Sequence, residues 1–545
     1  MSAVSSSAGA TQQRFTVFTG GPVLTMTARH EPVSVVVVAG GRIHAVGDTG
    51  LLATYPGALV VDLAGRTLVP GFIDAHCHLS IAALQPLWAD CSAAATGDEL
   101  GGILRRHRRD HPGAGWVRAD RWDESTTGLR FDRRDLDAAT GDTPTIVVHH
   151  TYHQCVVSSA GLDRLGIGRG PDRDDDCIDR DRTGEPTGLL IERAFGRAHS
   201  ESMAAYQEPD RWAEHVEHRA SELLRHGITA VHDAACGPAA EQLYRTMAAD
   251  RRLPVSVLVM PHPDPFLSHD LGARLDGPPT GEGDEQVRVG PVKLFADGGV
   301  APAIDVHHHG NHIAFGYRHV DLTERLVAAV ERGFRVAVHA MGNRGIADAL
   351  DAFEAARRRC GDGDHRFRIE HAGLASPPLA RRAAALGAVA VVQPGFVEHV
   401  GRSTHGFTPD DAAWLPFATL TEAGVDIAGS SDDPCGPVAP MGCAALGRSR
   451  TTSAGITLAP EEALPIEDWL RAYTAGAAHA GGQEDERGAI APGMRADLVI
   501  LSDIHGSDLT DAVEQTWVDG RCVYPGVGGG RALDRDGRSD GSVPI

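Results

Sequence analysis

Apolar and polar positions alternate along this chain in two different ways. Between residues 15 and 70, short apolar runs are separated by glycine turns. In "VSVVVVAGGRIHAVG" (33–47) this predicts a β-hairpin that turns at Gly40-Gly41. Beyond residue 70, short apolar runs alternate with longer stretches in which apolar residues recur every three or four positions. The first pattern indicates antiparallel sheet, and the second indicates parallel strands that are connected by helices.

The second region contains a series of predicted strands and amphipathic helices. The strands cover 71–78, 143–150, 227–234, 255–260, 290–298, 334–340, 366–372, 388–394 and 424–432. The clearest helices cover 322–333, 345–359 and 377–387. This many strand–helix units predict an α/β fold of the (β/α)8 TIM-barrel type.

The spacing of these elements also predicts how the chain is divided. Residues from about 80 to 225 form too long an interval for a strand–helix connection, so we expect a large insertion over the barrel mouth. Residues 487–525 return to short strands and turns. We therefore expect them to join residues 15–70 in a small β-sandwich-like domain built from both chain ends. The barrel then occupies residues 71–486.

Composition and charge narrow the class of protein. The 51 basic and 73 acidic residues give a formal net charge of −22, which argues against nucleic acid or an anionic membrane as a partner. No apolar stretch reaches the roughly 18 residues of a membrane span, and the start of the chain has no signal-peptide pattern. The 9 cysteines include no C-x-x-C pair, which fits a reducing compartment. We expect a cytoplasmic protein with a small-molecule partner; the oligomeric state stays open, a homodimer included. Residues 1–14 and 526–545 are small, polar and glycine-rich, and predict a disordered N-terminus and a flexible tail.

Histidines and one aspartate stand at the carboxyl ends of predicted strands. His76 and His78 in "DAHCH" are two residues apart, so both side chains point to one face of the strand and could grip one divalent metal ion. His339, His371 and Asp432 end three further strands. A TIM barrel carries its active site at this end of its strands, so the set predicts a metal site.

Lys293 in "GPVKLFADGG" is the one lysine of the chain, among 51 basic residues. A protonated amine has no lone pair for a metal ion. A lysine that loses its proton and adds CO2 becomes a carbamate, an oxygen ligand that can bridge two cations, whereas arginine stays protonated. Chance survival of one lysine in an arginine-rich chain is the alternative. We favour the carbamate, because one lysine placed at random has a chance of only about one in the chain length of falling on this position of the predicted strand.

These motifs resemble the metal-dependent amidohydrolase superfamily, in particular its amidohydrolase-3, or YtcJ-like, branch. The resemblance covers nearly the whole chain. It is carried by "LVPGFIDAHCHL", "VKLFADG", "HAMGN", "IEHAG", "SDDP", "GAIAPGMRADLVIL" and two stretches of the insertion, 153–167 and 184–194. Within the branch pattern, Asn343 stands where aspartate is usual, Ser158 where asparagine is common, and Gly299 where serine is more frequent.

The resemblance implies a ligand set and a reaction. The implied metal ligands are His76, His78, Lys293, His339 and His371, with Asp432 as the catalytic carboxylate close to the metal. The implied cofactors are one or two divalent ions, Zn²⁺ first and manganese or iron as alternatives, and CO2 as the carbamate of Lys293. The metal would activate water, and Asp432 would act as general base and then general acid. The implied enzyme hydrolyses a non-peptide C–N bond in a small amide, formamide or cyclic amide.

Two other functions keep the same fold. The site could serve isomerisation, deamination or decarboxylation instead, or the chain could be a non-catalytic scaffold. The complete ligand set argues against the scaffold. Trp122, His153 and Asp297 are the candidate substrate-binding residues. The four histidines of "IDVHHHGNH" (304–312), which include the His307–His309 run, are read as a lid or substrate-contact loop, with a second metal site as the alternative.

Overall fold

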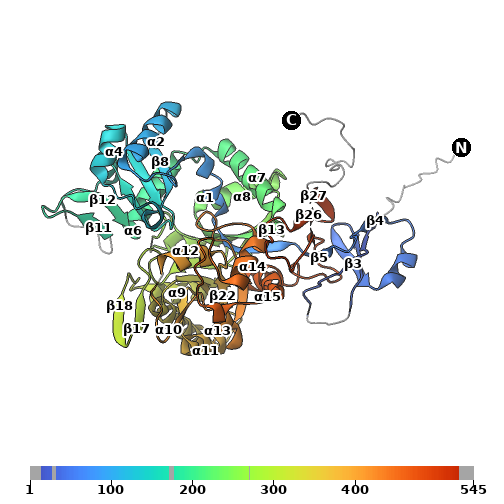
Figure 1. Ribbon diagram of the computed structural model, residues 1–545. Coiled ribbons are helices and arrows are strands. Elements are labelled where there is room, and N and C mark those ends of the chain that lie inside the picture. The colour runs from blue at the N-terminus through green and yellow to red at the C-terminus, as the bar shows by residue number, and fades with distance from the viewer. Residues whose placement is uncertain are drawn as a thin grey trace.

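The computed structural model describes most of the chain, and Figure 1 shows its arrangement. The described residues are 14–27, 32–113, 115–170, 177–268, 270–404 and 406–526. The predicted disordered N-terminus and flexible tail lie outside these ranges, apart from Arg14 and Gly526.

Parallel strands form two neighbouring sheets that carry most of the buried core. Their orders are β15-β14-β13-β6 and β16-β19-β20-β22-β24. The strands are β6 (Phe72–Cys77), β13 (Ile228–Cys236), β14 (Ser256–Pro261), β15 (Val287–Val289), β16 (Val292–Phe295), β19 (Val336–Ala340), β20 (Arg368–His371), β22 (Val389–Val392) and β24 (Asp426–Gly429). The edge strands β6 and β24 contact each other, and β14, which is next to the edge strand β15, contacts β16, so the two sheets adjoin at both sides. Most of these strands are buried along their whole length, as expected of parallel sheets that are covered on both faces.

Helices connect and cover these strands. They are α7 (Pro209–Arg225), α8 (Pro238–Ala249), α9 (Leu322–Glu331), α10 (Asn343–Cys360), α11 (Pro377–Ala385), α12 (Phe396–Ser403), α13 (Phe417–Glu422), α14 (Pro440–Ser449), α15 (Ile466–Arg471) and α16 (Ala477–Gly481). The predicted helices at 322–333, 345–359 and 377–387 are confirmed as α9, α10 and α11.

The residues between β6 and α7 build a separate sheet of order β11-β12-β10-β9-β8-β7. Its strands are β7 (Ala89–Asp90), β8 (Val117–Trp122), β9 (Thr145–His149), β10 (Gln154–Val157), β11 (Cys177–Arg180) and β12 (Pro186–Ile191). Its helices, with α1 leading in from β6, are α1 (Leu79–Ala82), α2 (Gly97–Asp110), α3 (Glu124–Thr127), α4 (Arg133–Thr140), α5 (Ser159–Leu165) and α6 (Arg193–Ala204). Figure 1 shows this unit on one side of the molecule, in blue to green.

The predicted strand at 143–150 is confirmed as β9, but its place among the central parallel strands is wrong. β9 pairs with β8 and β10 inside the unit just described. This unit has its own apolar core, which includes Leu104, Leu136 and Val147. β9 is therefore as fully buried as a central strand, and its hydrophobicity alone does not reveal which sheet it joins.

Segments from the two ends of the chain pair with each other. One sheet has the order β3-β2-β1-β4 and the other β27-β26-β25-β5. Their strands are β1 (Thr16–Thr19), β2 (Val35–Ala39), β3 (Arg42–Gly47), β4 (Leu59–Asp62), β5 (Thr67–Pro70), β25 (Leu498–Leu501), β26 (Val513–Val518) and β27 (Arg521–Tyr524). The predicted hairpin across Gly40-Gly41 is confirmed as β2–β3. Residues of both sheets, such as Phe18 and Trp517, share one apolar cluster.

Short strands complete the structure near the carboxyl ends of the central strands. β17 (Ile304–His308) pairs with β18 (Asn311–Phe315), and β21 (Leu374–Ala375) pairs with β23 (Ala413–Trp414). All 9 cysteines are free thiols. Among the described helices, none is long and apolar enough to cross a lipid bilayer.

Candidate active site

His76, His78 and Asp432 meet in the interior of the molecule. Their ligand atoms all lie within 4.8 Å of one another. His78 Nε2 is 3.1 Å from Asp432 Oδ1, and His76 Nε2 is 3.4 Å from the same oxygen. Two imidazole nitrogens from one strand end therefore converge on one carboxylate oxygen from another.

Backbone hydrogen bonds hold the two strand ends in this arrangement. The Asp432 N–H donates to the His76 carbonyl at 2.8 Å, and the His78 N–H donates to the Asp433 carbonyl at 2.7 Å. Asp432 has a φ of 59°, in the left-handed region that few non-glycine residues adopt. Arg219 of α7 donates to both oxygens of Asp433, at 2.6 and 3.0 Å, and balances the charge of this second carboxylate.

The Nδ1 atoms of the site histidines form hydrogen bonds on the side of each ring that points away from Asp432. His76 Nδ1 donates to the Glu370 carboxylate, and His78 Nδ1 donates to the Ala234 carbonyl at 2.8 Å. His371 Nδ1 hydrogen-bonds Gln393 Oε1 at 2.9 Å. Because carbonyl and carboxylate oxygens only accept, the protons of His76 and His78 sit on Nδ1. The Nε2 lone pair of His76 therefore faces Asp432, while His78 Nε2 lies within hydrogen-bond distance of the same carboxylate oxygen and becomes a metal ligand when it gives up its proton.

The electrostatics of the site keep these groups in metal-binding form. Burial lowers the pKa of His76 to about 3 and that of His371 to about 4, and lowers the pKa of His339 well below its ordinary value. Burial opposes ionisation of Asp432, but the hydrogen bond from His78 and the nearby imidazoles hold its pKa well below the usual range. His76, His339 and His371 are therefore neutral beside an ionised carboxylate, which are the protonation states that a transition metal needs. Burial opposes protonation of His78, but its hydrogen bond to Asp432 and the charge of that carboxylate together raise its pKa, so His78 would have to release a proton when a metal binds.

The lone lysine lines the same cavity. Lys293 lies in β16, is 1 % exposed, and shares the cavity wall with His339 and His371. The His339 and His371 ring centroids are 4.6 Å apart. Burial lowers the pKa of Lys293 to about 8, against the opposing effect of Glu370 and Asp432. A free amine, the form that can add CO2, is therefore accessible near neutral pH.

The donor set fits a divalent metal ion of the zinc type. His76 Nε2 is buried and has no hydrogen-bond partner among the described residues, although Asp432 lies 3.4 Å away. Nitrogen and carboxylate donors are those that zinc prefers, and each oriented imidazole has a hydrogen-bond partner on its far side. All six predicted ligands (His76, His78, Lys293, His339, His371 and Asp432) line one cavity.

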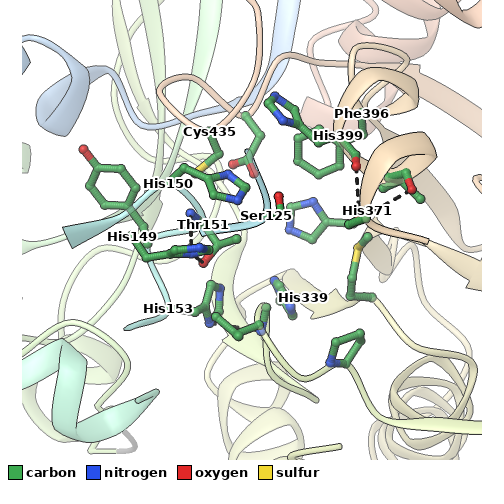
Figure 2. A pocket seen from close by; sticks show the side chains of 18 of the residues that line it. Ser125, His149, His150, Thr151, His153, His339, His371, Phe396, His399 and Cys435 are labelled. Atoms are coloured by element: carbon green, nitrogen blue, oxygen red, sulfur yellow. Dashed lines mark hydrogen bonds between the residues drawn. The ribbon is translucent and has the colours of Figure 1, made fainter. Parts of the chain in front are cut away.

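This cavity has a volume of ≈ 500 Å³, which suits a small molecule. Its apolar lining includes Phe266, Phe295, Phe315, Phe396, Phe407 and Trp414. A second, polar wall comes from residues 123–126 and 149–153 of the unit between β6 and α7. Figure 2 shows His149 and His150 of this wall on one side of the cavity, with His371 on the other.

His153 lies on the polar wall beside the candidate metal ligands. Its ring centroid is 5.0 Å from that of His339, and its Nδ1 is 2.8 Å from Glu192 Oε2. Glu192 is fully buried and has a φ of 51°. The loop after β16 fits closely against this pair. A Cβ on Gly299 would lie 2.2 Å from the His153 ring, and one on Gly298 would lie 2.6 Å from Glu192 Oε1. Two adjacent glycines therefore make room for the His153–Glu192 pair.

The structure places the other two candidate substrate-binding residues outside the cavity lining. Trp122 lies 5.1 Å behind His149, centroid to centroid, within an apolar cluster, and its Nε1 donates to the Leu129 carbonyl. Asp297 is fully buried and accepts from three backbone N–H groups, those of Ala303, Met341 and Gly342. Any effect of either residue on substrate would pass through the residues that it supports.

The departures from the family pattern have local explanations. Asn343 Oδ1 accepts from the Asp305 N–H at 2.8 Å while its Nδ2 donates to the Asp305 carbonyl, and an aspartate could not make the second bond. Ser158 accepts from the Gly161 N–H at 3.2 Å as the N-cap of α5. Gly299 leaves space for His153.

The histidine-rich segment forms the β17–β18 hairpin. Its histidines bond outward: His308 Nδ1 donates to the Thr408 carbonyl at 2.8 Å, and His312 pairs with Asp305 at 2.7 Å. Within the part of the chain that the structure describes, they form no group of three metal ligands. Ile304 and Phe315 at the base of the hairpin line the cavity.

Several residues that hold the site histidines in place were not predicted from the sequence. Glu370 accepts from Arg368 Nε at 2.7 Å and from His76, and all three side chains are buried. A sign of this pair in the sequence is that two opposite charges, Arg368 and Glu370, stand two residues apart in a fully buried strand, so they lie on the same face. Glu192 lies in the branch-like stretch 184–194, but nothing in that stretch indicates that it faces His153.

Comparison with known proteins gives a consistent picture. A sequence profile described as "Amidohydrolase family" matches residues 59–524. The chain is 35% identical over 541 residues to an N-substituted formamide deformylase from Arthrobacter pascens, covering 95% of this chain and 100% of that protein. It is 28% identical over 539 residues to the YtcJ protein of Bacillus subtilis, covering 93% of this chain and 99% of that one.

Solved structures show the same fold. A metal-dependent hydrolase of uncharacterized function from Pyrococcus horikoshii superimposes with a TM-score of 0.71 at 22% identity, covering 90% of this chain and 99% of that one. A similar hydrolase from Pyrococcus furiosus gives a TM-score of 0.67 at 23% identity, with the same coverage of both chains.

Proposed function

This chain belongs to the amidohydrolase family and is a metal-dependent hydrolase of non-peptide C–N bonds, and from that premise we propose its substrate class, ligands and catalytic residues. The substrate is a small N-substituted formamide or related amide with an apolar N-substituent. The observation that carries the proposal is the convergence of His76 Nε2 and His78 Nε2 on one oxygen of Asp432 at one end of an aromatic-lined cavity.

His76, His78, His339, His371 and carboxylated Lys293 hold the metal, with Asp432 beside it. The metal is zinc, one ion or two. When bound, it supplies Lewis-acid polarisation of the carbonyl and lowers the pKa of water towards neutrality. Because Lys293 is the single ε-amine of the chain, protein equilibrated with ¹³C-bicarbonate should give one side-chain carbamate signal in a ¹³C spectrum, and Lys293→Arg protein should lack it.

Asp432 and His153 have different roles in the reaction: Asp432 transfers a proton, and His153 contacts the substrate. Asp432 accepts the proton of the attacking water at its carboxylate and returns it to the leaving nitrogen. His153 contacts the substrate from the opposite wall through Nε2, because Glu192 engages its Nδ1. The Glu192 carboxylate fixes the tautomer and orientation of the ring, and so acts through His153.

The relative and the cavity lining together support the formamide class. The Arthrobacter pascens protein is a formamide deformylase by name. The phenylalanine and tryptophan side chains around the cavity favour an apolar or aromatic group on the substrate nitrogen. A formyl carbon is small enough to sit at the ligand cluster while this group occupies the aromatic wall.

A turnover screen tests the substrate class. Metal-reconstituted protein is offered N-formyl, N-acyl and cyclic amides of the same apolar amines, with Asp432→Asn protein as the blank. We expect release of formate and amine in equal amounts from the N-formyl compounds, and slower release from the N-acyl series. Turnover of cyclic amides alone would contradict the formamide class while leaving C–N hydrolysis in place.

Adding a methyl group at Gly299 tests the role of His153. The new Cβ of Gly299→Ala would lie 2.2 Å from the His153 ring, so the imidazole must move. We expect kcat/KM to fall by about 10- to 100-fold, with the metal content unchanged. Gly102→Ala is the matched control, because its Cβ meets nothing within 4 Å. Unchanged kinetics in the Gly299→Ala protein would argue against a substrate contact at His153.

Membership of the amidohydrolase family also supports a more detailed proposal for the barrel, the insertion and the small β domain. The two parallel sheets close into an eight-stranded barrel over residues 71–486, with β15 and β16 as one interrupted strand. Contacts of β6 with β24 and of β14 with β16 support this closure. Residues from about 80 to 225 are the insertion. Residues 15–70 and 487–525 form the β-sandwich-like domain, which the shared apolar cluster of their two sheets supports.

A further inference from the structure

A second set of metal-type donors lies on the polar wall of the cavity. Asp123, His149 and His150 bring one ligand atom each to within 4.8 Å of one another. Glu124 adds a fourth, since its Oε2 is 3.0 Å from His149 Nε2. We call these four residues the insertion cluster. It shares no residue with the His76–His78–Asp432 group, and all of its members line the cavity.

Local structure fixes the insertion cluster in place. His149 ends β9 and His150 follows it directly, while Asp123 is the N-cap of α3 and Glu124 is the first residue of that helix. Asp123 Oδ1 accepts from the Ser125 N–H at 2.9 Å, which anchors the carboxylate. Oδ2 accepts from the Thr126 hydroxyl at 2.7 Å and lies 3.9 Å from His150 Nε2, so a metal would use its remaining lone pair.

The ligand atoms of Asp123, His149 and His150 lie close enough together to bind one ion, and Glu124 lies against His149. Glu124 Oε2 is buried and lies 3.0 Å from His149 Nε2, a contact that lowers the pKa of the Glu124 carboxyl group. His149 Nδ1 is 2.8 Å from the Thr151 hydroxyl and 3.4 Å from the Thr151 N–H, which donates to it, so both Nδ1 contacts lie on the side away from Glu124. An imidazole that is oriented from behind by a hydroxyl has the arrangement of a metal ligand.

The charge of the insertion cluster also calls for a cation. Two carboxylates lie at the cavity wall, and in the described parts of the chain no arginine or lysine forms an ion pair with either. Their close charged partners are imidazoles. The His150 ring is stacked on His399, with centroids 5.5 Å apart and planes at 26°, which limits its movement. The two carboxylates are partly buried, so their mutual repulsion is only partly screened by water, and a divalent ion would neutralise both.

We propose that Asp123, Glu124, His149 and His150 form a second binding site for a divalent transition-metal ion, with zinc as the preferred ion. Two imidazoles and two carboxylates match the ligand types and the number of a tetrahedral zinc site. The site is independent of the ligands in the proposed function and comes wholly from the insertion. An ion there faces the same cavity, so it would hold an anionic or lone-pair-bearing group at the end of a substrate remote from the cleaved bond.

Metal stoichiometry tests the proposal without reference to activity. Full-length protein is equilibrated with Zn²⁺, dialysed against a weak chelator and measured by elemental analysis. The double variant His149→Gln/His150→Gln should hold one equivalent of zinc less per chain than the unaltered protein. His218→Gln removes an exposed histidine of α7 and should lose none. Equal zinc in the double variant and the unaltered protein would overturn the proposal, and would show a hydrogen-bonded polar cluster instead.

A second arm separates this site from the one in the proposed function. The variant His76→Asn/His78→Asn should retain one equivalent of zinc, and Co²⁺ in its place should give the visible absorption of a four-coordinate ion. Adding His149→Gln/His150→Gln to this variant should abolish that absorption. Loss of all metal from His76→Asn/His78→Asn, with circular dichroism unchanged, would also overturn the second site and leave the proposed function untouched.

Discussion

Lys293→Arg protein should fold but lose its metal-dependent turnover, by roughly 10³-fold or more in kcat/KM. Arginine keeps a positive charge where the site needs an anionic oxygen, and it cannot form a carbamate. Lys293 is 1 % exposed, so the guanidinium would also be buried among the imidazoles of the site. We expect the metal content to fall together with activity, as measured by elemental analysis, while circular dichroism stays that of the parent protein.

A smaller substitution separates loss of the ligand from crowding. Lys293→Ala leaves space beside the histidines, and a short carboxylate such as acetate should enter it and restore part of the activity. Rescue should increase with carboxylate concentration and be absent for Lys293→Arg. A Lys293→Arg protein with unchanged metal and turnover would contradict the carbamate, and the lone lysine would then be an ordinary buried residue.

Asp432→Asn should retain metal yet lose turnover, with kcat lower by about 10²- to 10⁴-fold. An amide has nearly the shape of the carboxylate and can still lie between His76 and His78, but it cannot accept the proton of water. The left-handed backbone at this position also suits asparagine, so we expect little loss of stability.

The Asp432→Asn substitution is informative because it should lower kcat while the metal content stays the same. Asp433→Asn is the neighbouring control, since Asp433 pairs with Arg219 and lies behind the site. It should cost stability, seen as a lower Tm, more than kcat. Turnover that survives in Asp432→Asn would assign the proton transfer to another residue, with His153 the first to examine.

The central site could be predicted because its residues follow a rule of topology. Carboxyl ends of parallel strands meet at one edge, so His76, His339, His371 and Asp432 were expected together although they are far apart in the sequence. The structure brings all of them, with Lys293, to one cavity. Their roles as ligands and proton carrier stay predictions.

The polar wall of the cavity could not be predicted in the same way. It depends on how the insertion sheet lies over the central strands, and no local pattern encodes that placement. Trp122 illustrates the difficulty, because an aromatic residue next to a loop fits a cavity wall and an apolar core equally well. Its neighbour His149 lines the cavity, while Trp122 packs behind it. Glu124 and Glu192 carry no signal at all until the insertion is placed.

The close fit of Gly298 and Gly299 against Glu192 and His153 has a consequence for engineering. The insertion and the loop after β16 are sterically complementary at this contact. In a chimera the two segments must therefore be exchanged together. A chimera that receives a foreign insertion but keeps this loop would face a gap or a collision beside the metal ligands. Directed evolution of new substrate ranges should therefore randomise positions 153, 192, 298 and 299 together, because changes at any one of them alone are constrained by the other three.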